Sequence, residues 1–119
     1  MKQGVVLVAH GSRDPEWSRP FERLALAVQK RDPSLAVALA YLEHGPSLDE
    51  ALAALAARGA LAIRVVPAFL GPGGHVREDL PRLVAAARQA FPALKIALDK
   101  SFGEEAGILD AIAQVIAAR

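Results

Sequence analysis

The segment that decides the fold is Val-Val-Leu-Val-Ala-His-Gly-Ser-Arg, residues 5–13. With Gly4 before it, the segment contains an apolar run at residues 4–9 that no polar side chain interrupts, which is the pattern of a β-strand covered on both faces. Strands of this kind belong to parallel sheets that carry helices on both sides. The run closes on His10, in a loop that contains Gly11. The segment therefore predicts an α/β fold with a histidine at the carboxyl end of its first strand.

The rest of the chain alternates between apolar runs and segments of helical period. The runs at 35–42, 61–69 and 95–98 are predicted to be strands. The apolar faces of the four predicted helices are Trp17, Phe21, Leu24, Ala25 and Val28; Leu48, Leu52, Leu55 and Ala56; Leu80, Leu83, Val84, Ala87 and Phe91; and Ile108, Leu109, Ile112, Val115 and Ile116. The order is β-α-β-α-β-α-β-α, in a single domain that spans residues 1–119.

Local signals mark where the helices begin and end. Asp14-Pro15 suits the start of the first helix. Ser47 as N-cap with Glu50 three residues later predicts a capping box at the second. Gly59 is a natural residue to follow its C-terminus, and Phe91-Pro92 ends the third helix. These signals fix the alternation without reference to any tertiary contact.

An uninterrupted β/α alternation implies a parallel sheet with right-handed crossovers. The commonest small arrangement is a three-layer, flavodoxin-like fold with strand order 2-1-3-4. Ligands of open α/β sheets bind outside the carboxyl ends of the strands at the topological switch, here between the first and third strands. His10 follows the first strand, and His75 follows the third after the glycine-containing loop 71–74. We therefore expect both imidazoles to open into one crevice.

His10 and His75 are candidate metal ligands and catalytic proton acceptors, because a neutral imidazole serves both purposes near neutral pH. Chance placement of two surface histidines is the alternative. Glu43 closes the second strand and either faces the same crevice or is a solvated strand end. His44 comes next, and since adjacent strand residues face opposite ways, only one of the pair is expected to enter the crevice.

Candidate anchors for an anionic ligand lie beside the two histidines. Ser12, Arg13 and Arg77 could contact carboxylates, although exposed arginines are common. Gly73-Gly74 permits positive φ and close approach of backbone N–H groups to an anion, or forms only a tight turn. The chain contains neither of the glycine patterns that bind dinucleotides or nucleoside triphosphates. It also lacks the strand-end aspartates that a phospho-acceptor receiver needs for Mg²⁺.

Composition narrows the function classes. The 119 residues are 53% apolar and 23% charged, which predicts one globular domain and not a disordered chain. The formal net charge of +1 provides no large positive field, so we expect no nucleic-acid partner. The absence of cysteine means that a metal site must use nitrogen and oxygen ligands. The first apolar run is too short for a signal sequence or membrane span, so we expect a cytoplasmic protein with no membrane partner.

Three parts of the chain together resemble a known enzyme family. They are Ala-His-Gly-Ser-Arg-Asp-Pro (9–15), Tyr-Leu-Glu (41–43) followed by Pro-Ser-Leu (46–48), and Pro-Ala-Phe-Leu-Gly-Pro-Gly-Gly-His-Val (67–76) with Asp-Leu-Pro (79–81). In order and spacing they are similar to the small class II tetrapyrrole chelatases of the CbiX/SirB type. Members of that family insert cobalt, iron or nickel into sirohydrochlorin without ATP, in cobalamin or siroheme biosynthesis.

The resemblance implies a metal chelatase in which His10 and His75 act at the metal-insertion site, with Glu43 nearby. The divalent metal, Co(II) with Fe(II) or Ni(II) as alternatives, is then a substrate, and no cofactor is permanently bound. The longer chelatases resemble two such units in tandem, which implies that a one-unit chain forms a homodimer. His44 is outside the family pattern. The substrate carboxylates would be held by Ser12, Arg13, Gly73, Gly74 and Arg77.

Two other functions remain open at this point. A non-catalytic metal or tetrapyrrole carrier would use the same histidines to bind and release without metallating the ring. A flavodoxin-like small-molecule module would carry its histidines incidentally and would copurify with a flavin.

Overall fold

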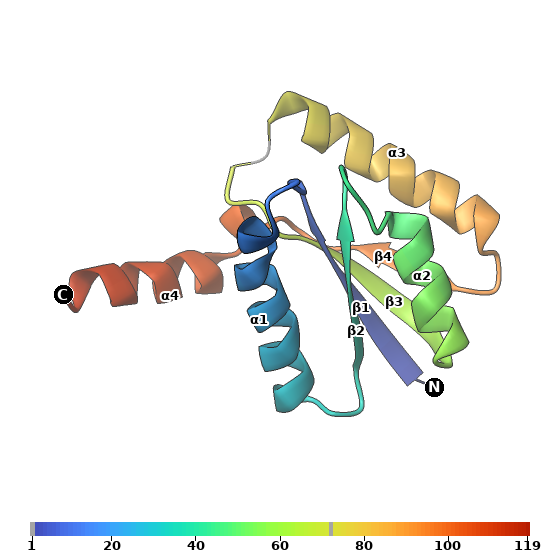
Figure 1. The fold of residues 1–119 in the computed structure, drawn as a ribbon, viewed down its shortest axis with the longest axis horizontal. Helices are drawn as coiled ribbons and strands as arrows, with labels where there is room; N and C mark the ends of the chain where they lie inside the picture. The colour runs from blue at the N-terminus through green and yellow to red at the C-terminus, as the bar shows by residue number, and fades with distance from the viewer. Residues whose placement is uncertain (1, 72) are drawn as a thin grey trace.

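A four-stranded parallel sheet forms the centre of the structure (Figure 1). The structure is a computed structural model that describes residues 2–71 and 73–119. The strands lie in the order β2-β1-β3-β4, as the sequence predicts. The strands are β1 (Lys2–Ala9), β2 (Ala36–Tyr41), β3 (Ala60–Pro67) and β4 (Lys95–Leu98). The helices are α1 (Pro15–Arg31), α2 (Leu48–Ala57), α3 (Gly74–Ala90), the 3-10 turn η1 (Phe102–Glu104) and α4 (Ala106–Ala117). No helix within the described ranges is long and apolar enough to cross a lipid bilayer.

The predicted helix signals are confirmed in the structure. The Asp14 side chain caps α1 by accepting a hydrogen bond from the N–H of Glu16 at 3.0 Å. Ser47 and Glu50 form both hydrogen bonds of the capping box that starts α2. Gly59, which follows the end of α2, has a φ of +89°, a conformation in which glycine is favoured. Local chemistry therefore accounts for these boundaries.

Alternate residues of the central strands face two different layers, because successive strand side chains point to opposite sides. The main core lies on the side of α2 and α3, where Val6 and Val8 of β1 belong to a buried cluster with Leu52 and Val84. The opposite face of β1 includes Leu7, on the side of α1. The sheet is thus apolar on both faces, as the uninterrupted run at residues 4–9 predicts.

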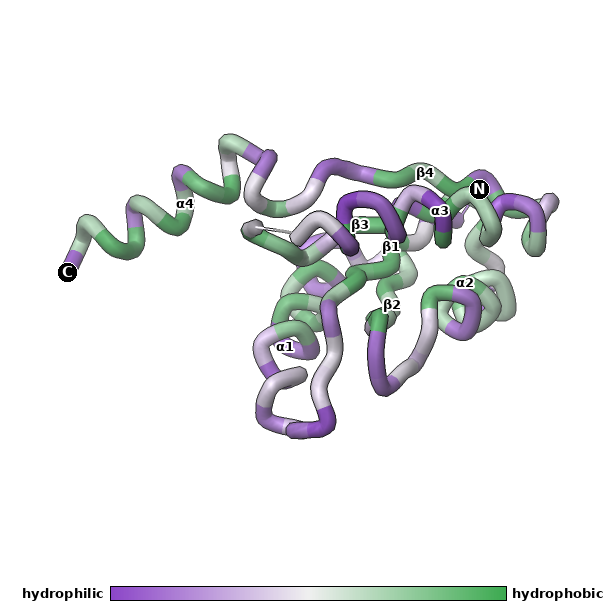
Figure 2. The backbone as a smooth tube through the Cα atoms, turned by 90° about the horizontal axis from the view of Figure 1, so that it is seen from above, coloured by the Kyte–Doolittle hydropathy of each residue, from purple (hydrophilic) through white to green (hydrophobic). Residues whose placement is uncertain are grey.

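The fourth predicted helix forms, but it does not cover the sheet. α4 leads away from the rest of the molecule in both views of the backbone (Figures 1 and 2). Its main contacts are with η1, and none of its residues is buried. The predicted sheet flanked by helices is confirmed, with α1 on one side and α2 and α3 on the other, while α4 extends from the end of η1.

Candidate functional site

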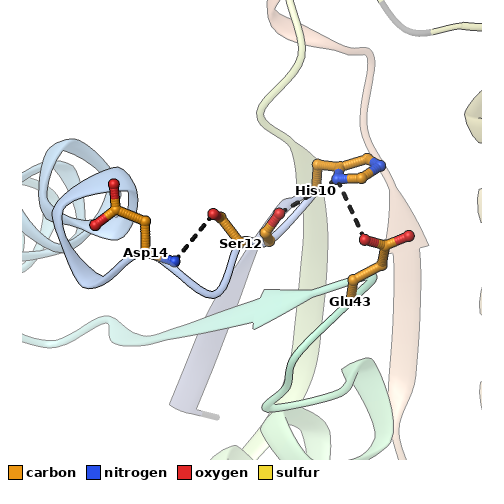
Figure 3. Close-up of polar contacts among 5 residues, drawn as sticks. His10, Ser12, Asp14 and Glu43 are labelled. Carbon is orange, nitrogen blue, oxygen red and sulfur yellow. Dashed lines mark hydrogen bonds and ion pairs between the residues drawn. The ribbon is translucent and has the colours of Figure 1, made fainter.

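Backbone pairing continues past the ends of β1 and β2 and brings His10 beside Glu43. The N–H of Leu42 donates to the carbonyl of Ala9 at 3.0 Å, and the N–H of Glu43 donates to the carbonyl of His10 at 2.9 Å. The two side chains lie together, with Nδ1 of His10 4.0 Å from Oε2 of Glu43 (Figure 3). They are 55% and 59% exposed, so a ligand can reach both of them.

Gly11 makes this close approach of the two strand ends possible. It is buried, its φ is +98°, and a Cβ at this position would overlap the backbone carbonyl of Glu43. Residues with side chains rarely adopt such a φ, and here the space is also missing. From the sequence, Gly11 is predicted only to lie in a loop. The one signal available was a glycine directly after a strand-end histidine, since the contact with residue 43 is long-range.

The surroundings of the His10 ring favour one tautomer. Nδ1 lies 3.3 Å from the carbonyl oxygen of Gly11 and 4.0 Å from the Glu43 carboxylate, and both of these groups accept hydrogen bonds. A proton on Nδ1 can be donated to the Gly11 carbonyl and is attracted by the Glu43 carboxylate, which leaves the lone pair on Nε2. The nitrogen pointing away from Glu43 is therefore the one able to bind a metal ion or accept a proton.

Of the predicted anchors on the first loop, Ser12 has a structural contact. Its hydroxyl oxygen accepts a hydrogen bond from the N–H of Asp14 at 3.1 Å, just before α1 begins (Figure 3). A hydroxyl can accept and donate at the same time, so this contact leaves its proton available to a ligand. Arg13, the next residue, is exposed. Both residues stand within the loop that starts at His10.

His75 lies in the first turn of α3, and not in the preceding loop as the sequence suggested. In Figure 1 the loop after β3 leads up to this turn, beyond the carboxyl ends of β1 and β2. Among the described residues, no hydrogen bond or ion pair joins His75 to His10 or Glu43, and no group of three or more His, Asp or Glu side chains is placed to hold a metal ion. The shared crevice of His10 and His75 stays a prediction.

Gly73 and Gly74 do not use the positive φ that glycine permits. Gly73 is the N-cap of α3 with a φ of −68°, and Gly74 is already helical. A Cβ at either position would meet open space. Glycine is therefore not required here by the backbone, and Pro72 lies outside the described residues. The two glycines form the start of α3, where no side chain of the N-cap residue accepts a hydrogen bond from the first N–H groups of the helix.

The loop that precedes α3 is hydrogen-bonded to η1. The N–H of Gly103 donates to the carbonyl of Phe69 at 3.1 Å, and a Cβ at Gly103 would overlap the backbone carbonyl of Leu70. No signal in the sequence singles out Gly103. This contact fixes where the chain leaves β3 on its way to α3.

Two small hollows adjoin the strand ends. One, of about 190 Å³, has an apolar lining from the ends of β1 and β2 and from α2 and α3, including Val8, Tyr41 and Leu83. The other, of about 130 Å³, includes Arg77 of α3 and Glu104 of η1. Pockets for drug-sized ligands usually measure about 300–1,000 Å³. Neither hollow alone encloses a large planar ligand, which would have to lie on an open surface or be covered by another molecule.

Comparison with known proteins identifies relatives over nearly the whole chain. The model of the CbiX family matches residues 4–119. A sirohydrochlorin cobaltochelatase of Saccharolobus solfataricus is 45% identical over 82 residues, which is 68% of this chain and 62% of that protein. The chain thus spans less than two thirds of the length of that relative.

Solved structures give the same relationship. A CbiX protein from Marinobacter aquaeolei VT8 has a TM-score of 0.84 and 31% identity, covering 98% of this chain and 95% of the other. The sirohydrochlorin chelatase SirB of Bacillus subtilis subspecies spizizenii, in complex with cobalt, has a TM-score of 0.75 and 28% identity. That match covers 99% of this chain but only 51% of the SirB chain. One unit of this fold therefore corresponds to half of the SirB protein.

Proposed function

Because the chain belongs to the CbiX family, we propose that it inserts a divalent metal ion into sirohydrochlorin, with Co(II) as the preferred metal and Fe(II) and Ni(II) as alternatives. The observation that carries the proposal is the pairing of His10 with Glu43 at the carboxyl ends of neighbouring strands. The similarity to a sirohydrochlorin cobaltochelatase supports the choice of macrocycle and metal. The metal ion and the macrocycle are both substrates, and no resident cofactor enters the reaction.

Metal insertion replaces two pyrrole N–H protons by one divalent ion, so the protein must present the ion and take up protons. In this proposal, Nε2 of His10 first holds the ion and, once the ion has passed to the ring, accepts one of the two protons, since its other nitrogen faces the Gly11 carbonyl and Glu43. The second proton passes to His75 or to water. Glu43 holds the ring in position and stabilises positive charge on it. His75 would approach from the first turn of α3 as a second ligand or proton acceptor. Nitrogen and oxygen ligands suit all three metals, so ligand type does not select among them.

The substrate carboxylates need cationic or N–H partners at the edge of the site. Arg13 and Arg77 are exposed, and a guanidinium can bind a carboxylate with two parallel hydrogen bonds. Ser12 and the N-terminal turn of α3, at Gly73 and Gly74, supply further donors. We assign these residues to substrate binding on the chemistry of their donors.

We further propose that the working unit is a homodimer whose two sites face one another. The hollow at the strand ends, about 190 Å³, is too small to enclose a tetrapyrrole, and a second copy would close it. The SirB chain is about twice as long as this unit, and cyclic dimers are the commonest oligomers. Leu70, 58% exposed, and half-buried Phe69 lie near the strand ends and suit such an interface.

Multiple turnover tests the proposed reaction. We expect the purified protein to convert many equivalents of sirohydrochlorin to the cobalt complex, followed by the absorbance of the macrocycle, and initial rates to fall in the order Co(II) first, then Fe(II) and Ni(II). A metal or tetrapyrrole carrier would stop at one metallated ring per site. That outcome, or a bound flavin in the purified protein, would contradict the chelatase assignment.

Glu43→Gln tests the role assigned to the carboxylate. The amide keeps the shape of the side chain but removes its charge, so we expect a fall in kcat of roughly tenfold, smaller than the 10²–10⁴-fold typical of losing a proton-transfer group. Glu50→Gln, on the capping box of α2, is a matched control that removes the same charge away from His10. Equal effects of the two variants on kcat would show that Glu43 acts only through the net charge.

A further inference from the structure

Three aromatic side chains, Trp17 and Phe21 of α1 and Tyr41 of β2, form a cluster on the side of the sheet that α1 covers. The ring centroids of Trp17 and Phe21 lie 4.9 Å apart. The Trp17 ring meets the Tyr41 ring edge to face, with centroids 6.1 Å apart. Aromatic pairs at such separations attract one another beyond the effect of the area that they bury. The cluster therefore fixes the first turns of α1 against the last residue of β2.

Tyr41 joins this aromatic cluster to the candidate site. It precedes Glu43 by two residues, and a Cβ at Gly11 would lie 3.0 Å from the Cβ of Tyr41. The N–H of Tyr41 donates to the carbonyl of Pro46 at 2.8 Å, which closes the turn that follows β2. Tyr41 therefore packs against the loop that carries His10 and also holds the turn that carries Glu43.

The loop between β1 and α1, residues 10–14, is attached to β2 at both of its ends. At its start, the carbonyl of His10 accepts a hydrogen bond from the N–H of Glu43. At its other end, Trp17, in the first turn of α1, packs on Tyr41. The side-chain hydrogen bonds formed in between join residues at most two positions apart, so they shape the loop without attaching it to the sheet. Trp17 is thus the attachment point nearest to the far end of the loop.

We propose that Trp17 is a positioning residue for metallation, because its contact with Tyr41 keeps the His10 imidazole beside Glu43. The inference rests on the proposed function, in which that imidazole presents the metal ion. Trp17 itself is assigned no contact with the metal ion or the macrocycle. Without its ring, the loop and the first turn of α1 lose their contact with the end of β2, and a misplacement of about 1 Å can lower a rate by as much as 10²-fold. The alternative is that the three rings only stabilise the fold.

Kinetics of ring-removing variants test the positioning role. Trp17→Leu keeps an apolar side chain but removes the ring that meets Tyr41. We expect kcat for Co(II) insertion to fall roughly tenfold, because His10 and Glu43 are then less well aligned. Trp17→Phe keeps a ring and should leave kcat within about threefold of the wild type. Tyr41→Leu removes the other ring of the contact, so it should lower kcat as Trp17→Leu does.

Phe91→Leu is the matched control for the loss of an aromatic ring. Phe91 is also half-buried and packs on the main core, but it follows the C-terminus of α3, at the other end of that helix from His75. We expect Phe91→Leu to lower the urea midpoint of unfolding, while kcat stays within about threefold of the wild type. An equal loss of kcat in Phe91→Leu and Trp17→Leu would overturn the proposal, because any loss of stability would then lower the rate.

A double variant tests whether Trp17 acts through His10. If Trp17 only positions the imidazole, adding Trp17→Leu to His10→Ala lowers the remaining rate by less than about twofold, because no imidazole is left to position. The remaining rate is measured at high protein concentration. Independent effects would instead multiply, and a further loss of about tenfold would overturn the proposal.

Amide hydrogen exchange, followed by NMR, measures the attachment of the loop without the reaction. The N–H of Glu43 donates to the carbonyl of His10 at 2.9 Å, so its exchange rate reports how often the two strand ends separate. We expect Trp17→Leu to raise this rate roughly tenfold and Trp17→Phe to raise it less than about threefold. The N–H of Val6, in the buried centre of β1, is the internal control. An equal rise at Val6 would show that Trp17 stabilises the whole sheet and would overturn the positioning role.

The exchange measurement needs no macrocycle, so it separates this proposal from the function on which it rests. An unchanged exchange rate at Glu43 in both Trp17→Leu and Tyr41→Leu would overturn the positioning role and leave the chelatase assignment standing. A wild-type chain that does not metallate sirohydrochlorin would contradict the chelatase assignment and the part of Trp17 in it. Faster exchange at Glu43 in Trp17→Leu would in that case still show that the ring contact holds the loop.

Discussion

Replacing His10 with alanine is expected to lower the rate of sirohydrochlorin metallation by 10²-fold or more, which is the range found when a proton-transfer group is lost. In the proposed reaction, the imidazole presents the metal ion and accepts a proton from the macrocycle. Its side chain is 55% exposed, so the free energy of unfolding should change by no more than about 0.5 kcal/mol. Initial rates with Co(II) and urea unfolding of the same preparation measure the two effects.

His44→Ala is the matched control for His10→Ala. His44 is also an exposed histidine and lies one residue from Glu43, but the proposed reaction assigns it no part. We expect its metallation rate to stay close to that of the wild type, and we expect His75→Ala to lose most of its rate, as His10→Ala does. Near-normal rates in both His10→Ala and His75→Ala would show that the two residues are surface histidines with no part in metallation.

Replacing Gly11 with alanine should damage stability and activity together. The φ of +98° disfavours any residue with a Cβ, and the added methyl would overlap the Glu43 carbonyl, so we expect a loss of at least about 2 kcal/mol in the free energy of unfolding. The strand ends must also separate, which moves Glu43 away from His10 and lowers kcat. Urea unfolding and initial rates at a temperature where the variant is folded measure the two losses.

Gly73→Ala provides the comparison, because a Cβ at Gly73 meets open space and its φ is −68°. We expect its stability to remain within about 0.5 kcal/mol of the wild type. If Gly11→Ala were equally harmless, the loop geometry that pairs His10 with Glu43 would not be a requirement of the fold.

The alternation of strands and helices and the strand order could be predicted from the sequence because their causes are local. The uninterrupted apolar run at residues 4–9, the capping box at Ser47 and Gly59 each act within a few residues. Strand order then follows from the short crossovers that an alternating chain allows. The same local reading correctly placed His10 and Glu43 at the ends of neighbouring strands.

What the sequence could not reveal depends on contacts between distant segments. The fit of Gly11 against residue 43, and of Gly103 against Leu70, exists only once the loops have been brought together. His75 was expected in a loop because glycines before it are typical of turns, yet Gly74 already begins α3. The aliphatic side chains of α4 recur at helical spacing whether or not the helix packs on its own sheet. Periodicity therefore predicts the helix but not its position.

Gly103 contacts the loop that carries Phe69 and Leu70, which belongs to the proposed dimer interface and also leads to α3. Its N–H donates to the carbonyl of Phe69 and its backbone lies against the carbonyl of Leu70, in the loop that leads to α3. α4 begins after one intervening residue beyond η1. Because Phe69 and Leu70 belong to the proposed dimer interface, formation of the dimer would change the position of this loop and of the start of α3, the helix that carries His75. Thermodynamic linkage then requires the macrocycle to strengthen dimerisation by the same factor by which dimerisation strengthens macrocycle binding. Turnover per chain would accordingly rise with protein concentration around the dimer dissociation constant, which makes assembly itself a control on metallation.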